Sequence, residues 1–365
     1  MAKLARRTES IDTSGIRKVF DLAAGLANPV NFSIGQPDFD VPDVVKDAAA
    51  DAIRDGFNRY TVTQGMSELR EAVRQRMRKT RNWEPEDVFI TSGVSGGLLL
   101  AILTLIDPGD DVLMSDPYFV SYKQLTRLVG ATCVFVDTYP DFRLTPERLE
   151  TAVTSKSKVL FVNSPANPTG AVYPAEDLKG IAEVCRKHDI TVVSDEIYDE
   201  FCYDGEYVSI TRYLPEALLL GGFSKSFGMT GWRLGYACGP KELVQQMLKL
   251  QQLSFVCAPS PVQKAGLVAL ECDTSEHIAE YRHKRDVIYE GLKDTFNVTR
   301  PSGAFYLFPQ VPAGTDMAFA RGAIERECLV IPGSVFSEHS THFRISYATT
   351  MEQIERGVEI LKSLV

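Results

Sequence analysis

The amino-acid sequence predicts an α/β protein with a mostly parallel sheet sandwiched by helices, together with a smaller α+β domain. From about residue 88 onward, short β-branched runs alternate with longer helical patterns. The runs are apolar along nearly their whole length, which is typical of parallel strands that helices cover on both faces. The last third of the chain loses this alternation, and this change indicates a second domain of different architecture.

Six apolar runs are predicted to be the strands of the large sheet, and the stretch 175–188 is predicted to be one of the helices between them. Ligands of such sheets bind beyond the carboxyl ends of the strands, so the residues that follow each strand are candidates for function. The six predicted strands are 88–91, 111–114, 131–136, 158–162, 190–194 and 217–220.

The C-terminal third is predicted to hold one long helix over 260–292, strands at 300–309 and 342–347, and a closing helix over 351–364. We expect the residues before about 40 to pack with it. A chain of 365 residues is long enough for two domains. The boundaries follow as 41–275 for the large domain and 1–40 plus 276–365 for the small one.

The composition excludes several classes of protein. The formal net charge is −9, which disfavours proteins that bind nucleic acid or membrane surfaces, because these use basic patches. The longest apolar runs, such as 98–106, fall far short of the roughly 20 residues that cross a bilayer. The charged N-terminus has no apolar run behind it, so we expect no secretory signal.

The cysteines and histidines indicate reduced thiols and no metal. The seven cysteines are scattered, odd in number and never spaced as Cys-x-x-Cys, and the five histidines do not pair with them at ligand spacing. This pattern fits a cytoplasmic protein better than a disulfide framework or a zinc site.

The residues after the first strand suit an anion. Gly93, Val94 and Ser95 belong to a run of small residues that leads into an apolar helix, where exposed N–H groups bind phosphate well. For this stretch alone, a glycine-rich turn is the slightly favoured alternative.

Two further strand ends carry candidates of lower specificity. Tyr118 and Phe119 follow the second strand and could offer a face to a flat ring, although core packing is the favoured explanation for these two residues alone. Asn167 lies in the sequence Asn-Pro-Thr-Gly after the fourth strand, where its amide could point into the cleft. Here a structural turn is the simpler explanation.

Asp195 comes directly after the buried fifth strand. Burying a carboxylate in that position costs free energy unless a cation pairs with it, and this cost favours a functional role. An equally good local explanation is a helix cap with Asp195 as its acceptor.

The strongest signal follows the sixth strand, where Lys225 lies among small residues and aromatics. Burial lowers the pKa of a lysine and makes its amine a nucleophile toward a carbonyl. Arg233 follows eight residues later between two glycines, where a guanidinium could bind a phosphate. A lysine that merely solvates a loop would not need this glycine-rich frame, so the functional interpretation is favoured.

Together these strand ends match the needs of pyridoxal phosphate. That cofactor requires a lysine amine, a carboxylate facing its pyridinium nitrogen, phosphate donors and a stacking face. The joint occurrence of the four is far more specific than any one of them.

The sequence resembles the class I/II pyridoxal-phosphate aminotransferases, which belong to the aspartate aminotransferase superfamily of fold type I. The resemblance runs from Ser-Ile-Gly-Gln-Pro-Asp-Phe-Asp at 33–40, through Asn-Pro-Thr-Gly at 167–170 and Ser-Lys-x5-Gly-x-Arg-x-Gly at 224–235, to Phe-Arg-Ile-Ser-Tyr-Ala at 343–348. It implies a large domain with a sheet of the seven-stranded type, a homodimer with shared active sites, and amino-acid and 2-oxo-acid substrates.

The resemblance also implies the roles of the residues around the reacting atoms. Lys225 matches the lysine that forms the Schiff base and then moves the substrate proton. Asp195 matches the carboxylate that keeps the pyridinium protonated. Tyr198 and Asn167 match the donors to the phenolic oxygen of the ring, and Phe119 matches the stacking aromatic, with Tyr118 as the alternative.

The remaining implied roles concern the phosphate and the substrate. Gly93, Val94, Ser95 and Arg233 match phosphate ligands, and Tyr60 matches a tyrosine that reaches the phosphate of the neighbouring subunit. Arg344 matches the arginine that clamps the substrate α-carboxylate, helped by Asn167 and the Gly35 amide. From the residues alone, an outward-facing Arg344 and a simple turn at Gly35 are the obvious alternatives.

Two positions depart from the family pattern. Gly222 stands three residues before the lysine, where a Ser or Thr commonly binds the phosphate, while Ser224 supplies a hydroxyl in a different place. We therefore expect weaker phosphate anchoring, or compensation by Ser95 or a water. Gln36 stands where acidic residues are common in the family, so the residue pattern does not define the substrate entrance.

We therefore expect a cytoplasmic aminotransferase that works by ping-pong exchange. Overall similarity slightly favours aspartate as the amino donor, and aromatic residues and alanine are the open alternatives. The alternative is a C–S β-lyase acting on cysteine-type substrates with the same cofactor. A catalytically silent regulator with this fold is disfavoured, because every catalytic position is occupied. Substrate selectivity is expected to come from a few pocket residues, including 14–19 and Tyr306.

Overall fold

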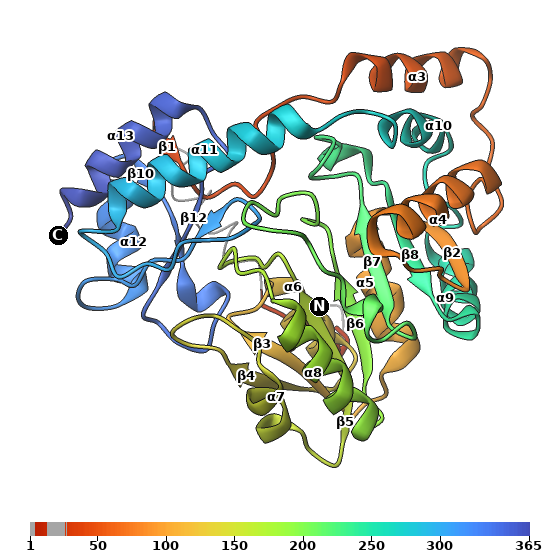
Figure 1. Ribbon diagram of the computed structural model, residues 1–365, viewed down its shortest axis with the longest axis horizontal. Helices are drawn as coiled ribbons and strands as arrows, with labels where there is room; N and C mark the ends of the chain where they lie inside the picture. Colours follow the sequence, from red (N-terminus) through yellow and green to blue (C-terminus); the bar gives the residue numbers. More distant parts are fainter. Residues whose placement is uncertain (1–3, 13–25, 27) are drawn as a thin grey trace.

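The computed structural model describes residues 4–12, 26 and 28–365, and a seven-stranded sheet lies at its centre (Figure 1). This sheet confirms the predicted fold class. In spatial order its strands are β2 (Asp87–Thr91), β8 (Gly235–Gly239), β7 (Leu218–Gly222), β6 (Thr191–Asp195), β5 (Ser157–Asn163), β3 (Asp111–Asp116) and β4 (Thr132–Asp137).

All six predicted strands are present, but sequence reasoning missed β8. This strand runs antiparallel to both of its neighbours, β2 and β7, while the other neighbouring pairs are parallel. Its two glycines hid it, since glycine is depleted in strands. At Gly235 a Cβ atom would lie only 2.7 Å from the carbonyl carbon of Gly93, so the close approach of two backbones requires glycine there.

The direction of β8 shapes the site. Because it runs against the other strands, its first residues lie at the edge of the sheet where their carboxyl ends lie. The segment that enters β8 is therefore brought to that edge together with the segments that leave β2 and β7.

Helices cover both faces of this sheet, as the apolar strands require. Side chains alternate between faces along each strand, so that Val112 and Met114 join one hydrophobic cluster while Leu113 joins another. Helices α5 (Gly93–Leu105), α6 (Val120–Leu128) and α9 (Lys241–Ser254) cover one face; α7 (Pro146–Ala152), α8 (Ala175–Lys187), α3 (Asp43–Arg54), α4 (Ser67–Arg81) and α10 (Ser260–Ala269) cover the other.

Two small sheets lie to one side of the large one (Figure 1). β1 (Val30–Asn31) pairs with β10 (Cys328–Leu329), so the residues just before 40 pack with the C-terminal third as expected. The other sheet has the order β11 (Ile331–Pro332), β12 (Phe343–Ser346) and β9 (Tyr306–Leu307). Around them lie α11 (Ser275–Leu292), α12 (Asp316–Glu325) and α13 (Met351–Lys362). The other elements in the described part of the chain are α1 (Arg6–Glu9) and the short 3₁₀ turns η1 (Ile210–Arg212), η2 (Thr230–Trp232) and η3 (Gly333–Val335).

Two expectations for the C-terminal third are wrong in extent. The predicted helix over 260–292 is two helices, α10 and α11, because the Asp273 carboxylate accepts hydrogen bonds from the Ser275 amide and hydroxyl and forms a turn between them. The predicted strand over 300–309 is reduced to Tyr306–Leu307. Its earlier amides, those of Ser302 and Gly303, bond instead to the Gly170 carbonyl.

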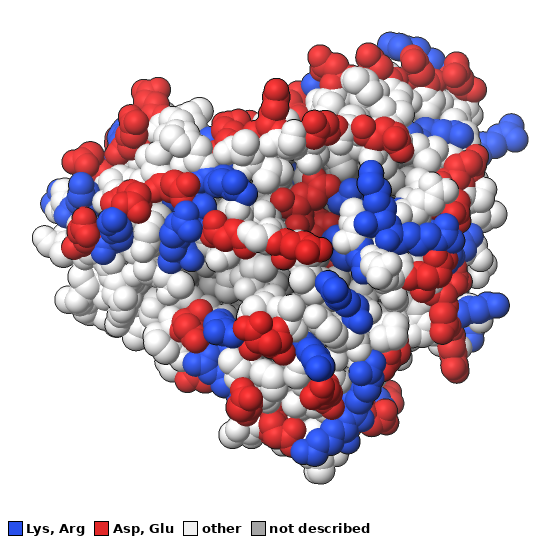
Figure 2. Space-filling model, in the orientation of Figure 1, with Lys and Arg blue, Asp and Glu red and all other residues white. Residues whose placement is uncertain are grey.

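Acidic and basic side chains are interspersed over the face drawn in Figure 2, with the same mixture above α11 and along α8. Within the described ranges, no helix combines the length and apolar character needed to span a bilayer.

Candidate active site

A cleft opens at the edge of the large sheet where the carboxyl ends of its parallel strands lie. Loops after β2, β3, β5, β6 and β7, the segment before β8, and residues of the small sheets meet there. The side chains and backbone that line the cleft belong to Gly35, Val94, Ser95, Leu98, Phe119, Asn163, Asn167, Asp195, Ile197, Tyr198, Ser224, Lys225, Thr230, Arg233, Tyr306 and Arg344.

Lys225 projects into this cleft from the loop after β7. Its Nζ donates a hydrogen bond of 2.6 Å to the backbone oxygen of Gly35. Burial, together with the nearby Arg344 and Arg233, lowers the pKa of Lys225 to about 8, while Asp195 partly opposes them. An amine with this pKa has a far larger neutral, nucleophilic fraction near neutral pH than an ordinary lysine has.

Asp195 ends β6 and lies buried on the floor of the cleft. Its Oδ2 accepts a hydrogen bond of 2.8 Å from the Tyr122 hydroxyl, and its Oδ1 accepts one of 3.3 Å from the Ile197 amide. Burial nevertheless raises the pKa of Asp195 to about 6. The carboxylate therefore lacks a full counter-charge of its own and is suited to a cationic ring nitrogen.

Tyr122 is a site residue that sequence reasoning missed. It lies on α6, and its ring stacks on Phe161 of β5 with ring centroids 4.5 Å apart. The available signal was its spacing of three residues from Phe119, which places both rings toward the sheet. Its partner Asp195 is 73 residues away in sequence, so the hydrogen bond itself had no local signature.

One end of the cleft is built for an anion. α5 begins at Gly93, where φ is +68° and a Cβ atom would lie 2.5 Å from Nη2 of Arg233. Glycine thus lets the guanidinium approach the start of the helix, where free N–H groups gather. Arg233 itself adopts a positive φ of 55° and donates through Nη1 to the Thr230 carbonyl at 2.8 Å.

The structure gives a physical reason for glycine at position 222. A Cβ atom there would lie 3.2 Å from the Cα of Gly235 and from the backbone oxygen of Leu234, so β7 and β8 leave little room for a side chain. Hydroxyls reach the cleft from Ser95, Ser224 and Thr230 instead. Thr230 was not among the predicted residues.

Arg344 lies on β12, and its buried side chain also lines the cleft. It donates to Asn167 Oδ1 at 3.1 Å and to the Ser33 carbonyl at 2.8 Å, while its Nε has no hydrogen-bond partner. Burial lowers the pKa of Arg344, since no carboxylate compensates it. A buried guanidinium that lines a cleft and keeps an unsatisfied donor is suited to a carboxylate ligand.

Some predicted residues lie elsewhere. Tyr60 is 81% exposed and does not line the cleft. Tyr118 turns away from the cleft and donates to Glu338 at 2.7 Å, whereas Phe119 lines it. Gln36 is exposed, and the predicted pocket segment 14–19 lies outside the described residues.

The residues present fit pyridoxal phosphate. An anion-binding helix start, a nucleophilic amine and a buried carboxylate without a full counter-charge occur in one cleft, and an aromatic ring, Phe119, lies among them. These are the four groups that the cofactor requires.

Comparisons with known proteins agree with this geometry. The model of the family described as aminotransferase class I and II matches residues 27–361. The chain is 38% identical to a probable aspartate aminotransferase of Methanocaldococcus jannaschii over 99% of both chains. It is 35% identical to the aromatic-amino-acid aminotransferase 2 of Thermococcus litoralis, over 99% of this chain and 98% of that protein.

A solved structure is similar over the whole length of this chain. The aspartate aminotransferase of Thermus thermophilus, determined with maleate, superposes with a TM-score of 0.96 at 36% identity, and the match covers 100% of each chain.

Proposed function

The chain belongs to the class I and II aminotransferases, and from that membership we propose which residues perform the reaction and which substrate it prefers. It is a pyridoxal-phosphate-dependent enzyme of fold type I that moves the α-amino group of an amino acid, such as aspartate or an aromatic residue, to a 2-oxo acid by ping-pong exchange. Bound in the cleft, the cofactor supplies an aldehyde for amines and a ring that accepts electrons.

Lys225 is the proposed catalytic residue. Its amine, with a pKa of about 8, would hold the cofactor and, once released by the incoming amine, would carry the proton that leaves the substrate α-carbon. Its Nζ lies 2.6 Å from the carbonyl oxygen of Gly35. The amine is therefore next to the residue whose amide is assigned to the α-carboxylate site.

Asp195, Tyr198, Asn167 and Phe119 would hold the ring. Asp195 would face the ring nitrogen, since its carboxylate is the buried acid of the cleft. Asn167 directs its Oδ1 to Arg344, which leaves its Nδ2 to donate to the phenolic oxygen beside the Tyr198 hydroxyl. Phe119 would stack on the ring face.

The helix start and the arginine next to it would hold the phosphate. Gly93, Val94 and Ser95 offer backbone and hydroxyl donors, and Arg233 offers a guanidinium. Ser224 adds a hydroxyl next to Lys225, and Thr230 adds another at the rim. These two hydroxyls would compensate for the missing side chain at Gly222.

Arg344 would clamp the substrate α-carboxylate, with the Gly35 amide and Asn167 beside it. Its unsatisfied Nε and its burial support this assignment. We propose aspartate as the preferred amino donor and 2-oxoglutarate as the acceptor. Support comes from the relative named an aspartate aminotransferase and from the solved relative with maleate, itself a dicarboxylate.

We also propose that two subunits share their active sites in a homodimer. Tyr60 is exposed and lies away from the cleft of its own chain, which suits a residue that reaches the phosphate of the partner subunit. The division into a large domain of 41–275 and a small domain of 1–40 plus 276–365 is part of the same proposal. All seven cysteines are free thiols, which supports a cytoplasmic location.

The observation that carries the proposal is the nucleophilic Lys225 in one cleft with Asp195, Arg233 and Arg344. Half-reaction rates should be measured from the cofactor spectrum across aspartate, aromatic donors and alanine. Aspartate should react fastest, and Lys225→Ala should abolish the spectral change. Full transamination by Lys225→Ala would overturn the assignment, and release of pyruvate and ammonia from cysteine-type substrates without an acceptor would favour the β-lyase.

A further inference from the structure

The segment 195–199, at the end of β6 and in the turn after it, directs its side chains to two different places. Residues 195 and 198 line the cleft, whereas residues 196 and 199 do not. The side chains of Glu196 and Asp199 are 1% and 8% exposed, so two acidic groups are buried on the side of the segment that faces away from the cofactor site. Buried carboxylates require a partner, and the partner must come from another element.

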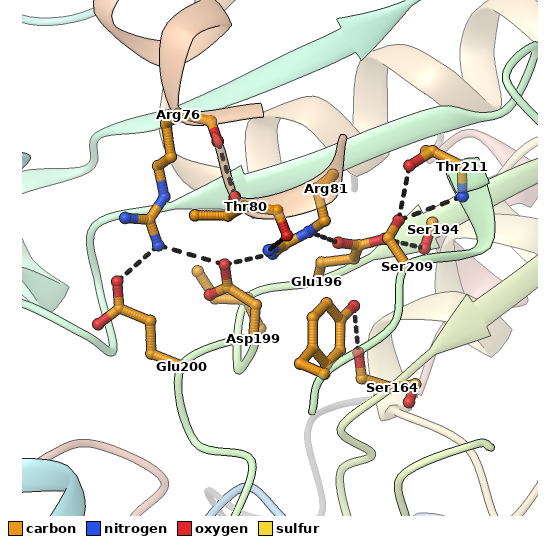
Figure 3. A network of polar contacts seen from close by, with 12 residues as sticks. Arg76, Thr80, Arg81, Ser164, Ser194, Glu196, Asp199, Glu200, Ser209 and Thr211 are labelled. Atoms are coloured by element: carbon orange, nitrogen blue, oxygen red, sulfur yellow. Dashed lines mark hydrogen bonds and ion pairs between the residues drawn. The ribbon is translucent and has the colours of Figure 1, made fainter. Parts of the chain in front are cut away.

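That partner is Arg81, the last residue of α4. Its Nε donates to Glu196 Oε2 at 3.0 Å, and its Nη2 donates to Asp199 Oδ2, so one guanidinium joins both carboxylates (Figure 3). The Arg81 side chain is only 5% exposed, and the Tyr207 ring lies 4.6 Å from its guanidinium carbon. Burial would lower the pKa of Arg81, but Asp199 and Glu196 outweigh it and raise that pKa.

Further hydrogen bonds fix each carboxylate. Glu196 Oε1 accepts from Ser194 Oγ at 3.0 Å and also from Ser209 Oγ. Asp199 Oδ2 accepts a second bond of 3.3 Å from Nη2 of Arg76, which also pairs with Glu200 (Figure 3). Although burial alone would raise the pKa of Asp199, the two arginines lower it, so the carboxylate stays ionised.

Backbone bonds then transmit this fixation to the cleft side. The Glu196 amide bonds to the Leu220 carbonyl of β7, the Asp199 amide to the Glu196 carbonyl, and the Phe201 amide to the Tyr198 carbonyl. Along this short turn, residues 195, 197 and 198 thus line the cleft, while residues 196 and 199 contact the arginine.

We propose that Arg81 is a positioning residue for the cofactor: by joining Glu196 to Asp199 it sets the places of Asp195 and Tyr198. The inference rests on the proposed function of these two residues. Arg81 does not line the cleft and acts only through the two carboxylates. Bidentate geometry matters, because an arginine can reach two acidic groups in a fixed plane and a lysine cannot.

The variants Arg81→Lys and Arg81→Met test this in the cofactor-loaded protein. The first readout is the pH midpoint of the visible cofactor band without substrate. The linkage between Lys225 and the cofactor loses its proton more readily when the phenolic oxygen accepts a hydrogen bond and the ring nitrogen is protonated. Displacement of Tyr198 and Asp195, which provide these two interactions, should therefore raise the pH midpoint of the visible band. We expect an upward shift of about half a pH unit for Arg81→Lys and about one unit for Arg81→Met.

Kinetics and hydrogen exchange provide two further readouts. The kcat of Arg81→Met should fall about tenfold or more, with KM for the amino donor within about twofold, because misplacement affects the reacting groups while Arg344 still binds the carboxylate. Backbone amides of 196–201 should exchange faster in both variants. Arg78 lies on the same helix as Arg81 and forms an exposed ion pair with Glu84, so in Arg78→Met all readouts should stay unchanged.

Each outcome decides the question. Folded variants with an unshifted midpoint and unchanged kcat, or with lower thermal stability alone, would overturn the proposal. If Arg81→Met does not fold, Arg81→Lys and Asp199→Asn decide, and Asp199→Asn should shift the midpoint in the same direction by less. An unaltered chain that forms no visible band would refute the proposed function, whereas a band insensitive to Arg81 would refute this inference alone.

Discussion

The hydroxyl oxygens of Tyr198 and Tyr306 lie 2.8 Å apart, so the two phenols share a hydrogen bond inside the cleft. Tyr306 comes from β9 of a small sheet and Tyr198 from the turn after β6 of the large one. The Arg344 guanidinium carbon lies 4.8 Å from the centre of the Tyr306 ring. One side chain therefore contacts both a proposed cofactor ligand and the proposed carboxylate clamp.

Replacing Tyr306 by Phe should lower kcat/KM by about fivefold, which is the effect of losing one net hydrogen bond of about 1 kcal/mol. The ring and its contact with Arg344 remain, so KM should change little. Steady-state kinetics with aspartate would measure this. Tyr198→Phe should have the larger effect, and a Tyr306→Phe enzyme impaired more than Tyr198→Phe would contradict the order of roles.

Replacing Tyr122 by Phe should make Asp195 a weaker partner for the ring nitrogen. The Tyr122 hydroxyl lowers the pKa of Asp195, which burial has raised to about 6, so its loss should raise that pKa further. More of the carboxyl is then protonated at a given pH. The acid limb of the kcat/KM profile should move to higher pH, with a loss of about tenfold near neutral pH.

The matched control for this variant is Tyr173→Phe, because Tyr173 is equally buried but does not line the cleft. Its pH profile should keep the unaltered acid limb. If both variants moved the limb alike, the hydrogen bond to Asp195 would not be the cause.

The cofactor-free protein should capture pyridoxal phosphate with a pH dependence set by Lys225. Only the neutral amine attacks an aldehyde, and the pKa of Lys225 is lowered to about 8. The capture rate should therefore rise with pH and level off above about pH 9, well below the range of an ordinary lysine. Rapid mixing with detection of the visible band would record it; a rate that still climbs steeply at about pH 10 would contradict the lowered pKa.

Replacing Gly93 by Ala should weaken cofactor binding. The residue has φ of +68°, and its Cβ would lie 2.5 Å from Arg233 Nη2, so both the helix start and the guanidinium must move. We expect a loss of affinity of about tenfold or more, measured by equilibrium titration. Gly231→Ala, in the loop that carries Arg233, is the control, because nothing lies within 4 Å of its added Cβ.

Sequence reasoning predicted the features that a local pattern encodes. Six strands are apolar runs of the right length, and Asp195 and Lys225 are charged residues placed directly after such runs. Burying a charge there is costly, which is why a single position could stand out. The Arg233 guanidinium was found for the same reason, since it lies in an otherwise small and apolar frame.

The missed features depend on partners far along the chain. Arg81 is one of several arginines in α4, and nothing local distinguishes it from Arg78, which is about half exposed. Its partners Glu196 and Asp199 lie more than 110 residues away. In the same way, β8 is recognised only by its pairing with β2 and β7, because Gly235 and Gly239 weaken its own strand pattern.

The placement of β8 also bears on how the chain assembles. β2 lies at one end of the large sheet and is joined to it through β8, although β3 to β7 all lie between Thr91 and Gly235 in the sequence. A nascent polypeptide that has emerged only to β7 can pair β3 through β7 but has no strand on which β2 can dock. The helix start at Gly93 is therefore brought next to the loop of Lys225 only late in biosynthesis. A shortened chain that ends before residue 235 would not form the anion site.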